Sequence, residues 1–135
     1  MSKESIARIY LIVEKIEYIE EITNQHGIVK SLEDATILRP AILMHLTAIA
    51  EQFNKLKKEH SDSILQNFDN DDLKGLYDVR TYIAHDYEGI NLAIIEWIIR
   101  NALPKFKQQC LGVIKDYEKN STNLTTRTDT NGGND

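Results

Sequence analysis

Residues 80–87, with the sequence RTYIAHDY, carry the side chains whose types and spacing are best suited to chemistry. The apolar spacing around them predicts a helix over about residues 72–85. On a wheel of roughly 100° per residue, Arg80 falls near the middle of an apolar arc, and His85 falls about 140° away, beside Asp78 and Thr81. The arc comprises Leu73, Leu76, Tyr77, Val79, Ile83 and Ala84. One helix therefore offers a permanent cation toward its packed side and an imidazole at its end.

Arg80 and His85 each admit a structural and a chemical interpretation. Arginine is rarely buried unless it is paired, so Arg80 could form a structural ion pair with Glu51 or with a partner subunit. Its guanidinium also suits a phosphate, because it keeps its proton and presents forked donors. His85 could be a helix-end histidine satisfied by a neighbour, or a general acid and base that moves a proton during a reaction.

The spacing R-x4-H-x-Y, formed by Arg80, His85 and Tyr87, resembles the motif of the HEPN domains. Within them it is similar to the HepT-like toxins that are encoded beside a small nucleotidyltransferase. The likeness extends to the flanks: residues 72–80 (DLKGLYDVR), residues 85–97 (HDYEGINLAIIEW) and residues 48–51 (AIAE), where many relatives carry Ile-Gly-Glu-Ala. R-x4-H alone occurs by chance in many proteins, but with these flanks the resemblance covers roughly residues 6–117.

The resemblance implies an all-α, up-and-down bundle of four to five helices that forms a two-fold homodimer. The motif helices would face each other, so that Arg80 and His85 of both chains line one composite cleft. The implied reaction is metal-independent cleavage of RNA, with the 2′-hydroxyl attacking the adjacent phosphate to leave a 2′,3′-cyclic end and no cofactor taking part. Thr81, Asp86 and Glu51 would be auxiliary residues.

Tyr87 also has two interpretations. As an amphipathic aromatic residue it could seal the end of the helix with its hydroxyl in water. In the HepT-like group, however, the tyrosine at this position is adenylylated by the partner nucleotidyltransferase, an MNT-type antitoxin. The resemblance therefore implies that Tyr87 is a modification site, at which AMP would obstruct the cleft and compete for Arg80 through its negative charge.

Two residues depart from the family pattern. Thr81 stands where many relatives carry an asparagine after the arginine, which would lower activity if that position holds substrate or orients the histidine. Ala50 replaces the frequent glycine before Glu51, so a close helix contact there is not expected to be kept.

Composition limits the classes of function that remain. A chain of 135 residues with 41% apolar residues and a net charge of −5 indicates one globular domain, without the basic surface that broad binding to nucleic acid needs. We therefore expect no DNA partner, and RNA contacts that are local or built across a dimer. The single cysteine, Cys110, excludes an internal disulfide and a multi-cysteine zinc site. With no apolar run of membrane-spanning length and no signal-peptide core, we expect a cytoplasmic protein that does not associate with membranes.

Helices are expected almost throughout. The spacing predicts a helix capped by Ser2 or Ser5 that runs to about residue 23, a short piece over 31–38, and a helix over 40–58 after a break at Arg39. The motif helix is followed by predicted helices over 92–102 and 104–119, the last opened by Pro104. Residues 120–135 are polar and are expected to form a disordered tail, which leaves residues 1–119 as the domain. His26, His45 and His60 match no motif and are expected to be ordinary surface or helix-flank residues.

Three functional hypotheses remain at this point. The chain could be a ribonuclease toxin, a non-catalytic subunit that supplies a nucleotide or substrate cleft to a nucleotidyltransferase, or a structural helical dimer. Substitution of Arg80 and His85 distinguishes them, because an enzyme would lose activity and keep its fold, whereas a structural ion pair would lose stability.

Overall fold

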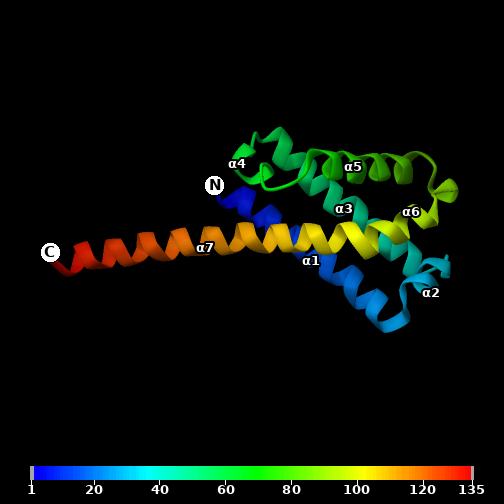
Figure 1. Ribbon diagram of the computed structural model, residues 1–135, viewed down its shortest axis with the longest axis horizontal. Helices are drawn as coiled ribbons and strands as arrows, with labels where there is room; N and C mark the ends of the chain where they lie inside the picture. The colour runs from blue at the N-terminus through cyan, green and yellow to red at the C-terminus, as the bar shows by residue number, and fades with distance from the viewer. Residues whose placement is uncertain (1, 135) are drawn as a thin grey trace.

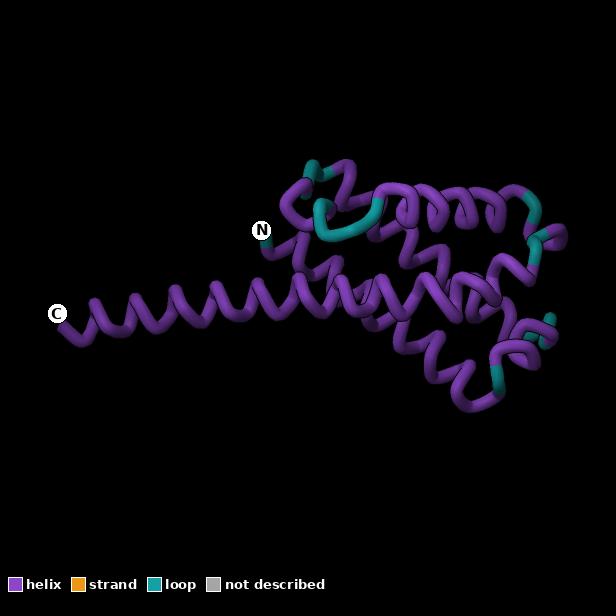
Figure 2. The backbone as a smooth tube through the Cα atoms, in the orientation of Figure 1, coloured by secondary structure: helices purple, strands orange, loops and turns teal. Residues whose placement is uncertain are grey.

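The computed structural model describes the backbone of residues 2–134 and the side chains of residues 2–121. Within that part the chain forms helices and no strand, so the predicted all-α bundle is confirmed (Figures 1 and 2). In chain order the elements are α1 (Lys3–His26), α2 (Ile28–Glu33), α3 (Leu38–Lys58), α4 (Asp62–Leu65), α5 (Asn70–His85), the 3-10 turn η1 (Tyr87–Gly89), α6 (Leu92–Trp97), the π-helical segment η2 (Ile98–Ala102) and α7 (Leu103–Asn134).

The core lies between α1, α3 and α7. The apolar stripe predicted for the first helix is confirmed, because its residues Ile6, Ile9, Val13, Ile16 and Ile19 are all buried. They pack against the buried side of α3, which presents Ile42, Leu43, Leu46, Ile49 and Leu56. Burial of branched aliphatic side chains at this spacing holds the two long helices together.

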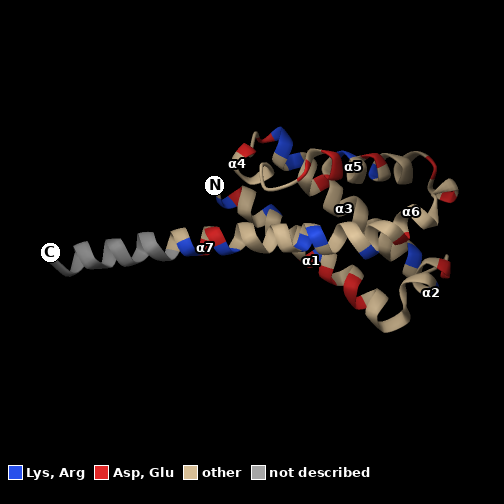
Figure 3. Ribbon diagram, in the orientation of Figure 1, with Lys and Arg blue, Asp and Glu red and all other residues tan. Residues whose placement is uncertain are grey.

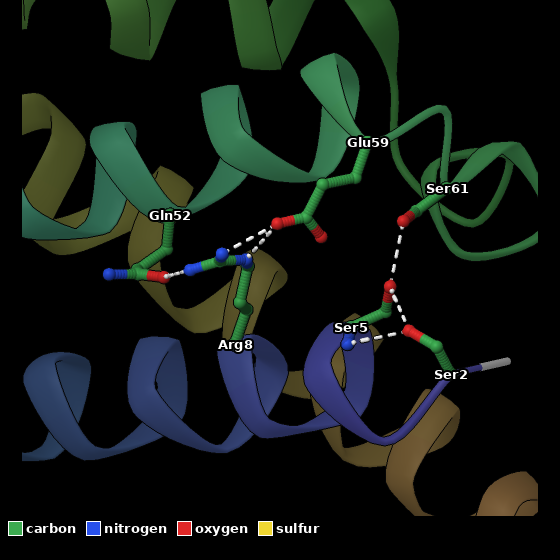
Figure 4. Close-up of polar contacts among 6 residues, drawn as sticks. All are labelled: Ser2, Ser5, Arg8, Gln52, Glu59 and Ser61. Carbon is green, nitrogen blue, oxygen red and sulfur yellow. Dashed lines mark hydrogen bonds and ion pairs between the residues drawn. The ribbon is translucent and has the colours of Figure 1, made fainter.

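Polar contacts join the start of α1 to the end of α3 (Figure 4). Arg8 on α1 donates hydrogen bonds to Glu59 from Nε (2.9 Å) and to Gln52 from Nη1 (3.1 Å). The hydroxyls of Ser5 and Ser61 lie 2.8 Å apart, which ties the start of α1 to the start of α4. The hydrogen bond from Arg8 holds the pKa of Glu59 below its ordinary value. These contacts fix how the ends of α1 and α3 lie relative to one another, while burial of the apolar stripe stabilises their packing.

Several expected boundaries differ from the structure. The break expected at Arg39 is absent, because α3 already begins at Leu38. The short helix expected over 31–38 is instead α2 at Ile28–Glu33, because the carboxylate of Asp34 accepts hydrogen bonds from the backbone of Thr36 (3.3 Å) and Leu38 (3.1 Å) and turns the chain into α3. The two helices expected over 92–102 and 104–119 are one continuous helical run. Pro104 cannot donate the α-helical bond and crowds the carbonyl four residues back. The chain widens to the π-helical form just before it, with the Leu103 N–H bonded to the Ile98 carbonyl.

The predicted domain ends at residue 119, close to residue 121, the last whose side chain the structure describes. α7 is helical to Asn134, beyond the helix end expected near residue 119. The side chains of residues 122–135 lie outside the described residues. The disordered tail expected over 120–135 therefore stays a prediction.

Three phenylalanines join α3, the loop before α5, and α7. Phe53 lies 4.9 Å from Phe68 and 5.4 Å from Phe106, measured between ring centroids, and all three side chains are buried. Aromatic pairs at such distances add to the stability that comes from burial. This cluster fixes the segment that leads into α5.

We expect Phe106→Ala to lower the free energy of unfolding by about 3–5 kcal/mol, because it leaves a cavity between the other two rings. Urea unfolding followed by circular dichroism measures the change. The matched control is Leu111→Ala, also on α7 but 38% exposed, which should cost far less. Equal losses for the two variants would show that this cluster does not carry the packing.

Candidate functional site

Helix α5 carries the motif and is attached to the rest of the molecule by a narrow strip. The carboxylate of Asp69 caps its start by accepting from the backbone N–H of Asp71 (2.8 Å). Only Leu76 of this helix is buried; Leu73, Val79 and Ile83 are partly buried against the core. Tyr77 and Ala84, which the wheel placed on the apolar arc, are exposed. The prediction of a broad packed arc was wrong there, because α5 rests mainly on one helix, α3, and the edges of its arc meet no neighbour.

Arg80 lies at the open edge between α5 and α3. Its Nε and Nη2 donate to the same oxygen of Glu51, Oε1, at 3.3 and 2.9 Å. The side chains of Arg80 and Glu51 are 32% and 44% exposed, so the guanidinium sits at the surface rather than in the core that its wheel position suggested. Within the part of the chain that the structure describes, Arg80 makes no other hydrogen bond. Its Nη1 edge is therefore available to a ligand.

His85 lies on a different side of the same helix, as the wheel predicted. It lines a shallow hollow of about 220 Å³ together with Asp78, Thr81, Tyr82 and Asp86. The imidazole is exposed and makes no hydrogen bond to any residue that the structure describes. The hydroxyl of Thr81 donates to the carbonyl of Tyr77 (3.1 Å), one turn earlier. That bond uses its proton but leaves its oxygen as an acceptor toward the hollow.

The turn after the helix gives Asp86 a structural task. Its carboxylate accepts from the backbone N–H of Gly89 (3.2 Å) and so closes η1. A β-carbon at Gly89 would lie 2.2 Å from Asp86 Oδ2, which is too close for any other residue unless the carboxylate moves. The motif helix ends at His85, as predicted, and Gly89 ends the turn that follows it.

Tyr87 sits inside this turn with its ring toward the molecule. The ring packs against the core, and the hydroxyl is buried with no hydrogen-bond partner among the described residues. The expectation that this hydroxyl reaches water was wrong, because the η1 turn folds the side chain inward. A buried hydroxyl without a partner is unfavourable, so the inward position is held by packing alone.

A second groove lies between α5 and the α6–η2 segment, and it shares no lining residue with the hollow at His85. It measures about 270 Å³ and is lined mostly by apolar side chains, among them Val79, Ile94 and Trp97. Trp97 is 59% exposed at its edge. The apolar composition of residues 92–102 would suggest burial on several sides, but the exposed Trp97 shows that one side is open. The side of α5 that faces α6 is therefore partly apolar.

The remaining histidines behave as expected of ordinary residues. His26 and His60 are exposed. His45 packs against the ring of Tyr18 (5.2 Å between centroids), and its burial, with the nearby charge of Lys15, lowers its pKa.

Comparison with known proteins identifies the family. A family model for HepT-like ribonucleases matches residues 12–113, a span that contains Glu51, Arg80, His85 and Tyr87. The chain belongs to the HepT-like ribonuclease family. It is also 26% identical over 121 residues to a protein of Methanocaldococcus jannaschii that is named as a gamma-glutamylcyclotransferase and a proposed RNase. That match covers 86% of this chain and 51% of the relative, so the chain spans about half of the relative's length. No solved structure matches the chain.

Three general properties of this HepT-like chain concern metal ligands, membrane spans and the distribution of charge. Among the described residues, no group of three or more His, Cys, Asp or Glu side chains is placed to hold a metal ion. Over the same part of the molecule, none of the helices has the length and apolar character needed to cross a membrane. Lys and Arg lie interspersed with Asp and Glu along the helices, so charge is not gathered on one element (Figure 3).

We expect the double variant Arg80→Gln, His85→Ala to lower the free energy of unfolding by no more than about 1 kcal/mol, because an exposed ion pair contributes little. Urea unfolding of the parent and the variant measures this. Leu76→Ala on the same helix is the positive control and should cost about 2–5 kcal/mol. A loss from the double variant as large as that of Leu76→Ala would favour a structural role for Arg80.

Proposed function

We propose that this HepT-like chain is the toxin of a toxin–antitoxin pair, an endoribonuclease that needs no metal. One observation carries the proposal: a HepT-like chain keeps the whole R-x4-H-x-Y motif, with the Nη1 edge of Arg80 and the imidazole of His85 both open to a ligand. Exposure of both groups is what contact with a ligand requires.

The two side chains suit the two needs of RNA cleavage. His85 takes the proton from a 2′-hydroxyl, whose oxygen then attacks the adjacent phosphorus, or returns a proton to the 5′-oxygen as its bond to phosphorus breaks. Arg80 stabilises the added negative charge on the phosphate oxygens with forked donors. The products are a 2′,3′-cyclic phosphate and a free 5′-hydroxyl.

A second copy of the chain would complete the site. In one chain Arg80 and His85 lie about 140° apart around α5, which is too far round the helix for both to reach one phosphate from the same side. A two-fold pair of α5 helices would bring Arg80 of one copy next to His85 of the other. The wide exposed surface of α5, and the apolar groove with Trp97 beside it, support a partner on this face.

Control by a cognate nucleotidyltransferase is the regulatory part of the proposal. Adenylylation of the Tyr87 oxygen would release pyrophosphate from ATP and place a phosphodiester beside Arg80. Since the hydroxyl points inward in the unmodified chain, the η1 turn must open before the oxygen can attack. The missing hydrogen bond lowers the cost of that opening.

A non-catalytic role remains the second candidate. Glu51 already occupies two donors of Arg80, and the net charge is −5, both of which weaken the attraction of a phosphate. In that case the chain would serve as a substrate-binding or nucleotide-binding subunit of the nucleotidyltransferase.

Induced expression of the chain alone should arrest growth and produce RNA fragments that end in 2′,3′-cyclic phosphate. His85→Ala, at matched protein level, should do neither, because the proton transfer is lost. His60→Ala, an exposed histidine remote from the motif in sequence, is the matched control and should behave as the parent. Growth and RNA unchanged by the parent would move the binding-subunit role ahead.

Tyr87 should react slowly with N-acetylimidazole, which acetylates accessible tyrosine hydroxyls. Tyr82, which is 54% exposed, should react quickly in the same sample. Asp86→Ala removes the bond that closes η1 and should raise the rate at Tyr87, whereas Asp78→Ala should not. Peptide mass spectrometry measures each site. Equal rates of acetylation at Tyr87 and Tyr82 in the parent would show that the Tyr87 hydroxyl is already exposed to solvent.

A further inference from the structure

Tyr77 is an exposed aromatic residue that the motif does not include. It lies three positions before Arg80 on α5, so the two side chains share one side of the helix. Arg80 Cζ lies 5.8 Å from the centroid of the Tyr77 ring, within the range of a cation–π contact. The ring is thus held beside the cation that is proposed to grip the phosphate.

Apart from the contact with Arg80, the Tyr77 side chain has no packing role in the core. It is 40% exposed and is not part of the apolar core, although the helical wheel placed it on the packed arc. Its hydroxyl makes no hydrogen bond within the described part of the chain; only its backbone carbonyl is used, by Thr81. A planar ligand would keep the contact with Arg80 only if it stacked on the ring face that points away from the guanidinium.

We propose that Tyr77 is the stacking platform for the nucleobase next to the phosphate bound by Arg80. The inference rests on the proposed ribonuclease function and deepens it by naming the substrate class: unpaired RNA. Proteins recognise single-stranded RNA by stacking splayed bases on aromatic rings while arginine holds the backbone. A base inside a duplex is already stacked on its neighbours and is not available to the ring.

The charge of the chain gives stacking more weight. With a net charge of −5 and with Glu51 already on Arg80, general attraction to the RNA backbone is weak. Stacking does not depend on net charge and works for every base. A single aromatic contact next to the phosphate therefore supplies binding where electrostatic attraction does not, and directs it to loops and single strands.

The decisive experiment pairs a protein variant with a substrate variant. The substrates are a short single-stranded RNA that the parent cuts at one bond, and two versions of it with an abasic nucleotide on one or the other side of that bond. For the parent, one abasic substitution should raise KM about tenfold with kcat nearly unchanged, because a stacked base is lost. Tyr77→Ala should raise KM for the intact RNA by the same factor and should show no further rise with that abasic RNA.

Other variants separate stacking from support of Arg80. Tyr77→Phe keeps the ring and should retain the parent's KM, whereas Tyr77→Leu keeps apolar bulk without an aromatic face and should behave like Tyr77→Ala. Tyr10→Ala, on α1 and 45% exposed, is matched in exposure and should leave KM unchanged. Circular dichroism and light scattering check that each variant keeps its fold and the parent's oligomeric state.

The outcomes distinguish the inference from the proposed function. If abasic RNA penalises the parent and Tyr77→Ala by equal further factors, or if Tyr77→Ala lowers kcat with KM unchanged, Tyr77 only supports Arg80 and the stacking inference is wrong. If the parent cuts paired and unpaired RNA equally well, it is also wrong. If the parent neither cuts nor binds RNA, and the His85→Ala variant likewise binds none, the ribonuclease proposal itself fails.

Discussion

The packing of α1 against α3 is the interaction on which the other elements depend. Four isoleucines of α1, Ile9, Ile12, Ile16 and Ile19, are fully buried, and they leave α3 as a fixed support in the middle of the molecule. Helix α5 lies on the other side of that support and contributes one buried side chain, Leu76. The motif helix is thus held in place by α3 while the side of α5 that faces away from α3 stays exposed. A helix with so little buried area would not be stable alone, so the chemistry of α5 relies on a core to which it adds little.

This division of labour explains why the proposed site has two halves. A helix that is packed on one narrow strip can expose side chains on both flanks of that strip, and here Arg80 occupies one flank and His85 the other. A single chain that needed both groups at one phosphate would place them on one face of the helix. Their separation is expected if a dimer has two sites, each formed by Arg80 of one copy and His85 of the other. In that case both exposed sides of α5 would be needed for the proposed reaction.

The sequence predicted the elements well where periodicity was strong and less well where local polar contacts decide. The α1 stripe and the motif helix follow from apolar spacing, because burial on one side needs that spacing. Spacing cannot show that Asp34 stops α2, that a π-helical widening carries the chain past Pro104, or that Tyr87 turns inward. The wheel also treats every apolar residue on an arc as packed. Whether Tyr77 meets a neighbour depends on how many helices surround α5, which is a property of the whole fold.

The two contacts of the Arg80 guanidinium divide its work. Glu51 holds Nε and Nη2 from the side of α3, which fixes the plane of the guanidinium and partly offsets its charge, while the Tyr77 ring lies beside it on α5. A phosphate approaching Nη1 therefore meets a cation that is oriented but weakened. Orientation reduces the entropy lost on binding, and the weakened charge limits binding of RNA that makes no further contact. If the proposed cleavage of RNA holds, an acidic chain would gain affinity mainly from contacts close to the bond that breaks, and here Arg80, at the edge between α3 and α5, lies beside the exposed ring of Tyr77.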